Sequence, residues 1–216
     1  MKSRSPTKTE KKTEAGKGKR LAPEVRRAQM LDAAARMIVE QGYLPLPVEE
    51  LARQVGASKG LVYAYFPTQY DLFNTLLERE IDSLLLGGLE TASQVKDLEQ
   101  AAVLCAMLYF EHVARSGPLL NILMTDLYMA GHLSPKVRHS CEAIAVRLTH
   151  LAARELPCSE EEIHAAIEMM TAIPDEAGRL VFHRELDQTT ARQICHGLIE
   201  SCLKALRAPE KVSVPD

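Results

Sequence analysis

The sequence predicts an all-α protein, and three observations support this prediction. The 216 residues include no tryptophan, 4 phenylalanines and 6 tyrosines, so the core must be mainly leucine, alanine, isoleucine, valine and methionine. Apolar residues recur at the helical spacing of three and four. The chain shows neither an alternating strand pattern nor an internal repeat. We therefore expect an N-terminal three-helix module that contains a helix-turn-helix, followed by a larger helical part.

The first helix is expected from about residue 23 to residue 41. Pro23 suits the first turn, where its missing N–H is not needed, and Glu24 complements the positive helix N-terminus. An apolar stripe runs along this helix and stops before Gly42, which can cap the helix. The members of the stripe are Leu31, Ala34, Ala35 and Ile38. This helix would form the hydrophobic floor of the module.

Residues 47–66 have the pattern of a helix-turn-helix. Gly56 allows the turn, and Ser58 is a natural N-cap for the second helix. The first helix of the motif turns one apolar face inward, formed by Val48, Leu51, Ala52 and Val55. The second turns Val62, Tyr65 and Phe66 inward, and Lys59, Leu61, Tyr63 and Ala64 outward. A short helix with hydroxyl and ammonium groups on its outward face can enter the major groove of DNA.

The same region resembles the DNA-binding domain of the tetracycline-repressor (TetR) family of bacterial transcription regulators. Residues 48–73, VEELARQVGASKGLVYAYFPTQYDLF, carry the resemblance, which extends back through residues 30–34 and 40–43 and covers about 24–77. Two positions depart from the family pattern. Leu46 precedes Pro47 where a capping serine or threonine is usual, and Gln69 replaces a lysine expected to contact phosphate.

The resemblance implies a homodimer that binds double-stranded DNA at a palindromic operator, as a repressor that a small hydrophobic effector releases. Lys59 and Tyr63 are expected mostly at backbone phosphates, and Leu61 and Ala64 near base edges. The residues expected to contact DNA are Ser58, Lys59, Gly60, Leu61, Tyr63, Ala64, Tyr65, Thr68 and Gln69. The alternative is a helical architectural or interaction protein that binds DNA without sensing a small molecule.

A long helix over residues 68–89 should connect this module to the rest of the chain. Thr68 caps it, Asp71 lies in its first turn, and the pair Gly87–Gly88 should end or bend it. We take residues 21–67 as the DNA-binding domain and 68–208 as a ligand-binding and dimerisation domain. Further helices are expected at 97–115, 118–130, 134–156, 159–183 and 187–207, with a kink or break near Ile173 because Pro174 follows it.

The resemblance also suggests roles for the C-terminal helices. In the family, the last two long helices form a four-helix bundle with a second subunit. The apolar stripe of residues 187–207 is broader than one core face needs: Ile194, Leu198, Ile199, Cys202, Ala205 and Leu206. The family's effector pocket is usually lined where Met107, Tyr109, Phe110, Met124, Tyr128 and Met129 cluster. Of these, Met107, Phe110, Met124 and Tyr128 are the expected pocket residues, although methionine at helical spacing also fits plain core.

Charge is concentrated at the N-terminus. Residues 1–20 carry eight Lys/Arg and two Glu, a net charge of +6, whereas the whole chain has −3, so residues 21–216 carry −9. We expect residues 1–20 to be a disordered basic arm, which either aids solubility or binds phosphates, and residues 209–216 to be a disordered tail.

Several other classes are not supported. The five cysteines are scattered, which fits reduced thiols, and the seven histidines include no HExxH motif, so no metal site is expected. No GxSxG, Walker or GxGxxG element is present, and we expect neither an enzyme nor a cofactor. No apolar run reaches the roughly 20 residues that span a bilayer, and no secretory signal is visible, so we expect a cytoplasmic protein with no membrane partner.

Overall fold

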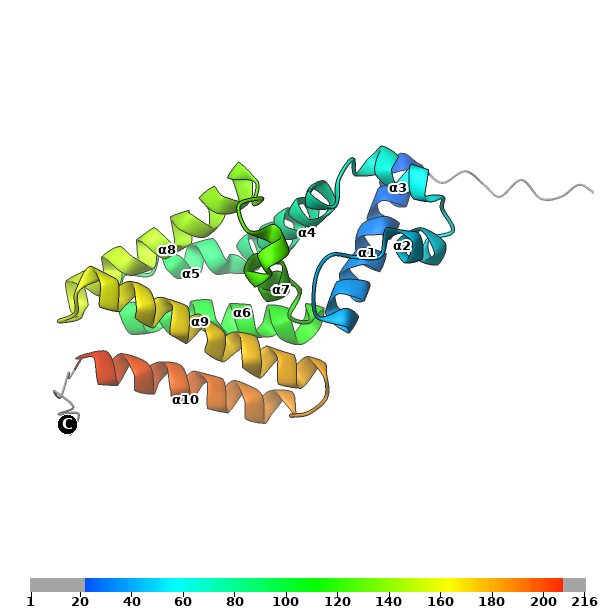
Figure 1. Cartoon of the computed structure of the whole chain (residues 1–216). Helices are drawn as coiled ribbons and strands as arrows, with labels where there is room; N and C mark the ends of the chain where they lie inside the picture. Colours follow the sequence, from blue (N-terminus) through cyan, green and yellow to red (C-terminus); the bar gives the residue numbers. More distant parts are fainter. Residues whose placement is uncertain (1–21, 208–216) are drawn as a thin grey trace, which may run out of the picture.

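A computed structural model describes residues 22–207, and all regular structure within them is helical (Figure 1). The expected all-α class is confirmed. The arm at 1–20 and the tail at 209–216 lie outside the described residues. In chain order the elements are α1 (Pro23–Gln41), α2 (Val48–Gln54), α3 (Lys59–Tyr65), α4 (Gln69–Leu84), a π-turn (Leu85–Leu89), α5 (Glu90–Ser93), α6 (Leu98–Ser116), α7 (Leu119–Thr125), a 3-10 turn (Leu127–Met129), α8 (Pro135–Glu155), α9 (Glu160–Phe182) and α10 (Gln188–Arg207).

Helices α1, α2 and α3 form the expected module at one end of the molecule (Figure 1). Helix α1 ends at Gly42, whose φ of 77° is left-handed and favours glycine. The hydroxyl oxygen of Ser58 accepts a hydrogen bond from the N–H of Leu61 at 3.1 Å, which confirms the predicted cap of α3. The core of the module contains residues with at most 2% of their surface exposed: Met30, Ala33, Ala34, Ile38, Leu51, Val62 and Phe66.

The first half of α4 belongs to the same core. Leu72, Phe73, Leu76 and Leu77 are at most 1% exposed and pack in one cluster with the residues of α1–α3. Thr68 begins α4 with a capping box, because its hydroxyl accepts from the Asp71 N–H while the Asp71 carboxylate accepts from the Thr68 N–H. This shared packing ties the N-terminal half of α4 to the DNA-binding module.

The far end of α4 bends at the glycine pair, as expected. Gly88 has a φ of 109°, which a residue with a side chain rarely adopts, and it lies in the π-turn between α4 and α5. Beyond the bend, the chain continues through α5 into α6. The expected helix at 68–89 is therefore α4 followed by a bend.

The C-terminal body is built on α6, α9 and α10, which pack against one another, with α8 along the other side of α9 (Figure 1). Helices α6 and α9 approach closely at Gly178. An added Cβ there would lie 2.6 Å from the Cβ of Val113 and 2.9 Å from the carbonyl oxygen of Phe110. A glycine is therefore required at this crossing of the two helices.

Two expectations about the body need correction. Of the predicted kink or break near Ile173, the break is wrong, because α9 continues through Pro174 to Phe182. A proline inside a helix costs about 3 kcal/mol, because it removes a hydrogen bond and its ring clashes with the preceding turn, and packing of α9 on α6 and α10 offsets this cost. The segment 118–130 is not one helix. It forms α7, ends at Asp126, and then makes a short 3-10 turn.

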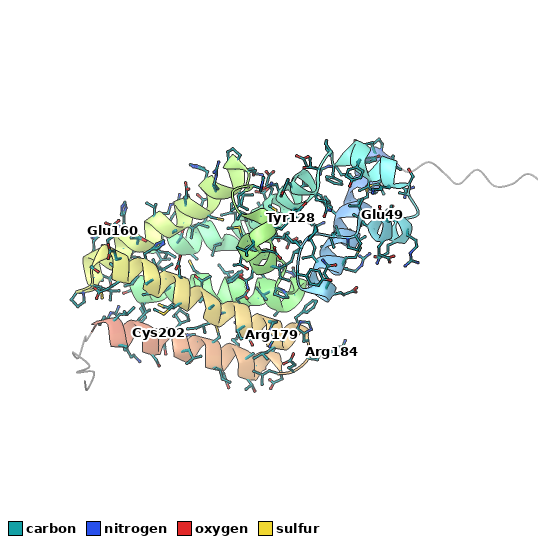
Figure 2. The ribbon with its side chains drawn as sticks, in the orientation of Figure 1. Glu49, Tyr128, Glu160, Arg179, Arg184 and Cys202 are labelled. Carbon is teal, nitrogen blue, oxygen red and sulfur yellow. The ribbon has the colours of Figure 1, made fainter. Side chains whose placement is uncertain are left out.

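The module and the body meet where α7 ends. The carboxylate of Asp126 accepts a hydrogen bond from the backbone N–H of Leu44, in the loop between α1 and α2, at 2.9 Å. The ring of Tyr70, on α4, stacks on both Tyr128 and His132, with centroids 4.9 and 3.8 Å apart. Tyr128 lies between the two parts of the molecule (Figure 2). The α7 segment is thus in direct contact with the DNA-binding module.

Candidate DNA-binding surface and apolar cavity

The outward face of α3 is the candidate DNA-binding surface. Val62 and Phe66 are buried and hold the helix on the module, so its other side faces outward. The predicted DNA-contacting residues that are exposed are Ser58, Lys59, Gly60, Leu61, Tyr63, Ala64 and Thr68. This arrangement leaves a short helix with hydroxyl, ammonium and small apolar groups free to enter a groove.

Tyr65 and Gln69 are placed differently from the other predicted contacts. Tyr65 is half-buried against the module core, which fits its place in the inward stripe. The side-chain oxygen of Gln69 accepts a hydrogen bond from the N–H of Leu46 at 2.9 Å. Leu46 and Gln69, the two departures from the family pattern, therefore contact each other. Gln69 accepts from a backbone N–H just before α2, a helix that no side chain caps.

The cations on this surface are paired with glutamates of α2. The ammonium of Lys59 bonds to Glu49, and the guanidinium of Arg53 bonds to Glu50 at 2.6 Å. The hydrogen bond from Lys59 lowers the pKa of Glu49, and the same bond raises the pKa of Lys59. Glu49 lies at the end of the molecule that carries α3 (Figure 2). In this structure the Lys59 ammonium is thus paired with a carboxylate of α2.

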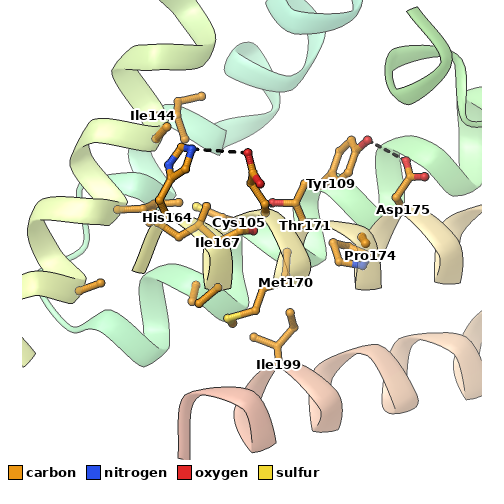
Figure 3. Close-up of a pocket in the computed structure, with 18 of the residues that line it drawn as sticks. Cys105, Tyr109, Ile144, His164, Ile167, Met170, Thr171, Pro174, Asp175 and Ile199 are labelled. Carbon is orange, nitrogen blue, oxygen red and sulfur yellow. Dashed lines mark hydrogen bonds and ion pairs between the residues drawn. The ribbon is translucent and has the colours of Figure 1, made fainter. Parts of the chain in front are cut away.

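A cavity of about 730 Å³ lies inside the body, between α6, α8, α9 and α10. Its lining is mostly aliphatic, and helix α7 closes one end with Leu120, Asn121 and Met124. Figure 3 shows side chains of α6, α8, α9 and α10 that surround it. Its apolar wall is formed by residues such as Leu98, Cys105, Ile144, Leu148, Ile163, Ile167, Met170 and Ile199.

Only some of the predicted pocket residues line the cavity. Met124 lines the cavity, and so does Tyr109, from the wider predicted cluster. The other three expected pocket residues do not line it. Phe110 is fully buried beside α10, Met107 packs against the same cluster, and Tyr128 stacks on Tyr70 at the junction. Met129, also in the wider cluster, is buried in the core of the module.

The sequence contained a signal for the missed walls. Cys141, Ile144 and Leu148 recur at helical spacing in the helix that becomes α8. They are only half-buried, because the space that they face is the cavity.

One polar cluster stands in this apolar cavity. The hydroxyl of Tyr109 donates a hydrogen bond to Asp175 at 2.7 Å (Figure 3). The amide of Asn121 donates to the other carboxylate oxygen at 3.0 Å. Burial raises the pKa of Asp175 above its ordinary value despite these two donors. Burial, together with the neighbouring Asp175, raises the pKa of Tyr109. The cluster joins α6, α7 and α9 at one end of the cavity.

An exposed apolar stripe runs along α9 and α10. Met169 is 67% exposed, and Ile194 and Leu198 are 50% and 47% exposed. The small residues Ala165 and Ala172 on α9 and Ala205 on α10 are exposed as well. Apolar residues thus occupy the outward side of α10 as well as its inward side, which holds Cys195, Ile199 and Leu203.

Residues 22–207 contain neither a cluster of metal ligands nor a membrane-spanning helix. No group of three or more His, Cys, Asp or Glu side chains in this part of the chain could hold a metal ion. None of its helices is both long and apolar enough to cross a membrane. Cys105, Cys141, Cys158, Cys195 and Cys202 are all free thiols.

Comparisons with known proteins relate this fold to a regulator family. Residues 30–76 match the family model described as bacterial regulatory proteins, tetR family. The transcriptional activator FasR of Mycolicibacterium smegmatis is 28% identical over 142 residues, which are 64% of each chain. The nucleoid occlusion factor SlmA of Actinobacillus pleuropneumoniae is 33% identical over 102 residues, 46% of this chain and 50% of the relative.

The fatty acid metabolism regulator protein of Bacillus subtilis is 32% identical over 99 residues, 46% of this chain and 51% of the relative. The chain therefore matches from half to 64% of the length of these three relatives.

Solved structures share the fold over most of the described residues. A TetR-like transcriptional regulator from Rhodococcus sp. RHA1 has a TM-score of 0.63 at 18% identity, over 86% of this chain and 99% of the other. The regulator FadR of Bacillus subtilis, in complex with stearoyl-CoA, has a TM-score of 0.60 at 18% identity, over 85% and 98%. At such low identity the likeness establishes the fold alone.

Proposed function

Since the chain belongs to the TetR family of bacterial regulatory proteins, we propose that it represses transcription and that an apolar small molecule releases it from DNA. The observation that carries the proposal is the cavity of about 730 Å³, whose wall includes α7, the segment in contact with the DNA-binding module. A ligand that moves α7 therefore also acts on the module.

The DNA-binding part of the proposal rests on α3. A dimer would place its two copies of α3 against half-sites about one helical turn apart, roughly 34–36 Å, on a near-palindromic operator. A nuclease footprint on the DNA upstream of the gene, followed by binding assays with the protected fragment, tests this. Tyr63→Phe and Lys59→Ala should weaken binding to all sequences, because both are expected at phosphates. Lys96→Ala, an exposed lysine on the body, is the matched control.

The ligand is proposed to carry an apolar chain. The long aliphatic wall suits an acyl chain, and the neighbouring structure of FadR contains stearoyl-CoA. If the ligand binds the DNA-free form more tightly, it weakens operator binding by a factor that is typically 5- to 150-fold. DNA must then weaken ligand binding by the same factor. Titrating acyl compounds into the protein–operator complex measures this factor. An acyl ligand that binds in the cavity and leaves operator affinity unchanged would refute the coupling.

The contacts of α7 suggest how the signal travels. Asn121, Met124 and Thr125 line the cavity, while Asp126, the next residue, holds the loop of Leu44. A ligand that pushes on this helix strains the Asp126 contact and the stacking of Tyr128 on Tyr70, so each module shifts relative to its half-site.

We also propose that the exposed stripe of α9 and α10 is the dimer interface. Two copies of the stripe would bury Met169, Ile194 and Leu198 against each other, which favours a four-helix bundle. Leu198→Glu should give monomers in light scattering, because it buries a charge in the interface. Gln193→Glu, on the same helix and also exposed, is the control for the added charge and should stay dimeric.

A role in DNA organisation without an effector is the second candidate. The similarity to a protein named nucleoid occlusion factor favours it, since that match is 33% identical. The two functions differ in one measurement. Operator binding that no apolar ligand changes, by a protein that occupies many chromosomal sites in chromatin immunoprecipitation, would support the second candidate over the first.

A further inference from the structure

We propose that the cavity selects acyl ligands whose buried part is uncharged, such as esters and alcohols, and rejects free carboxylates, with Asp175 as the residue that discriminates. This inference rests on the proposed function, because it assumes that the cavity binds an acyl ligand. It adds the chemical class of the polar end of that ligand.

The charges of the cavity wall carry the inference. Two carboxylates line it, those of Asp175 and Glu168. None of the lining residues within 22–207 is a lysine or arginine. A ligand carboxylate taken into this space would lose its water and meet charge of its own sign. A neutral ester or hydroxyl group of the same chain would lose far less hydration free energy.

Two arginines near lining residues in the sequence are held by other carboxylates. Arg179, one turn beyond Asp175, bonds to Glu176 and Glu185 at 2.7 and 3.1 Å. Arg207, one residue after the lining residue Leu206, bonds to Glu99 at 2.6 Å. Turning either arginine towards a ligand would break an existing ion pair, so these cations offset the repulsion only weakly.

The hydrogen bonds around Asp175 determine which ligand groups it can contact. Both carboxylate oxygens already accept hydrogen bonds, one from Tyr109 and one from Asn121. A hydroxyl ligand can still donate to a remaining lone pair of Asp175, and an ester oxygen can lie beside the cluster without repulsion. A ligand carboxylate has no proton to donate at neutral pH and is repelled.

His164 and Glu168 line a largely exposed part of the wall, where their side chains lie 3.4 Å apart. Glu168 adds a second negative charge to the wall at this place.

The test compares three ligands of equal chain length: methyl dodecanoate, 1-dodecanol and dodecanoate. Their binding to the full chain is measured at pH 7.5 by displacement of a fluorescent apolar probe, at concentrations below micelle formation. We expect dodecanoate to bind at least 10-fold more weakly than the ester, which corresponds to about 1.4 kcal/mol. Equal or tighter binding of dodecanoate would overturn the inference and leave the proposed function standing. If none of the three ligands binds, both fail.

Two variants assign the discrimination to charge. Asp175→Asn keeps the size and polarity of the side chain but removes its charge, so the ratio between ester and acid affinities should shrink at least 3-fold. Thr171→Lys places a cation at an exposed lining position of α9, and it should tighten dodecanoate binding while leaving the ester unchanged. If the ratio stays at its wild-type value in both folded variants, Asp175 is not the discriminating residue and the inference fails.

Discussion

Replacing Gly178 with alanine should lower stability, although alanine normally strengthens a helix. The new Cβ would lie 2.6 Å from the Cβ of Val113 and 2.9 Å from the carbonyl oxygen of Phe110. Neither atom can move by rotation of a side chain, because one is backbone and the other is attached directly to it. Helix α9 must therefore shift away from α6, and both helices line the cavity.

The magnitude follows from two opposing terms. Overpacking a well-packed site costs about 1–3 kcal/mol, and the contact with two fixed atoms favours the upper half of that range. Alanine gains about 1 kcal/mol over glycine in helix propensity. The net loss should be about 1–2 kcal/mol, or roughly 2–8 °C in melting temperature for a chain of this size.

Thermal unfolding followed by circular dichroism measures this change at one fixed protomer concentration. Gly197→Ala on α10 is the matched control, because no atom lies within 4 Å of its Cβ position. It should be stable to the same degree as wild type or up to about 1 kcal/mol more stable. The reasoning would be refuted if Gly178→Ala melted at or above the wild-type temperature while the control behaved as expected.

Three further predictions concern charged residues. Glu80→Gln should cost about 2 kcal/mol at neutral pH, because it weakens the contact of Glu80 with the buried His112 at 3.1 Å. Burial alone would raise the pKa of Glu80, but His112 and Arg79 outweigh it and lower the pKa, so urea unfolding should show the loss shrinking as the pH falls below about 4. Glu49→Gln should tighten operator binding, since it frees Lys59, and an unchanged affinity in gel shifts would argue against a phosphate contact by this lysine. Asp126→Ala should reduce the effect of methyl dodecanoate on operator affinity, and a full ligand response would show that the signal bypasses α7.

The sequence alone placed the elements that depend on local chemistry. Ser58 caps α3 and Gly42 ends α1 as expected, because a cap involves only residues a few positions apart. The inward stripe of Val62 and Phe66 likewise determined which side of α3 faces outward. The helix-turn-helix could therefore be located residue by residue from local sequence patterns.

Tertiary structure alone decided the cavity and the behaviour of Pro174. Met107 and Phe110 lie on α6 beside Tyr109, but only Tyr109 faces the cavity, because the packing of α6 against α9 and α10 determines which side of the helix is covered. A proline inside a helix is unfavourable on local grounds, yet α9 continues past Pro174, because it packs on α6 and α10 over its length. The partners of Asp175 come from helices 54 and 66 residues away, and no local pattern in the sequence predicts such contacts.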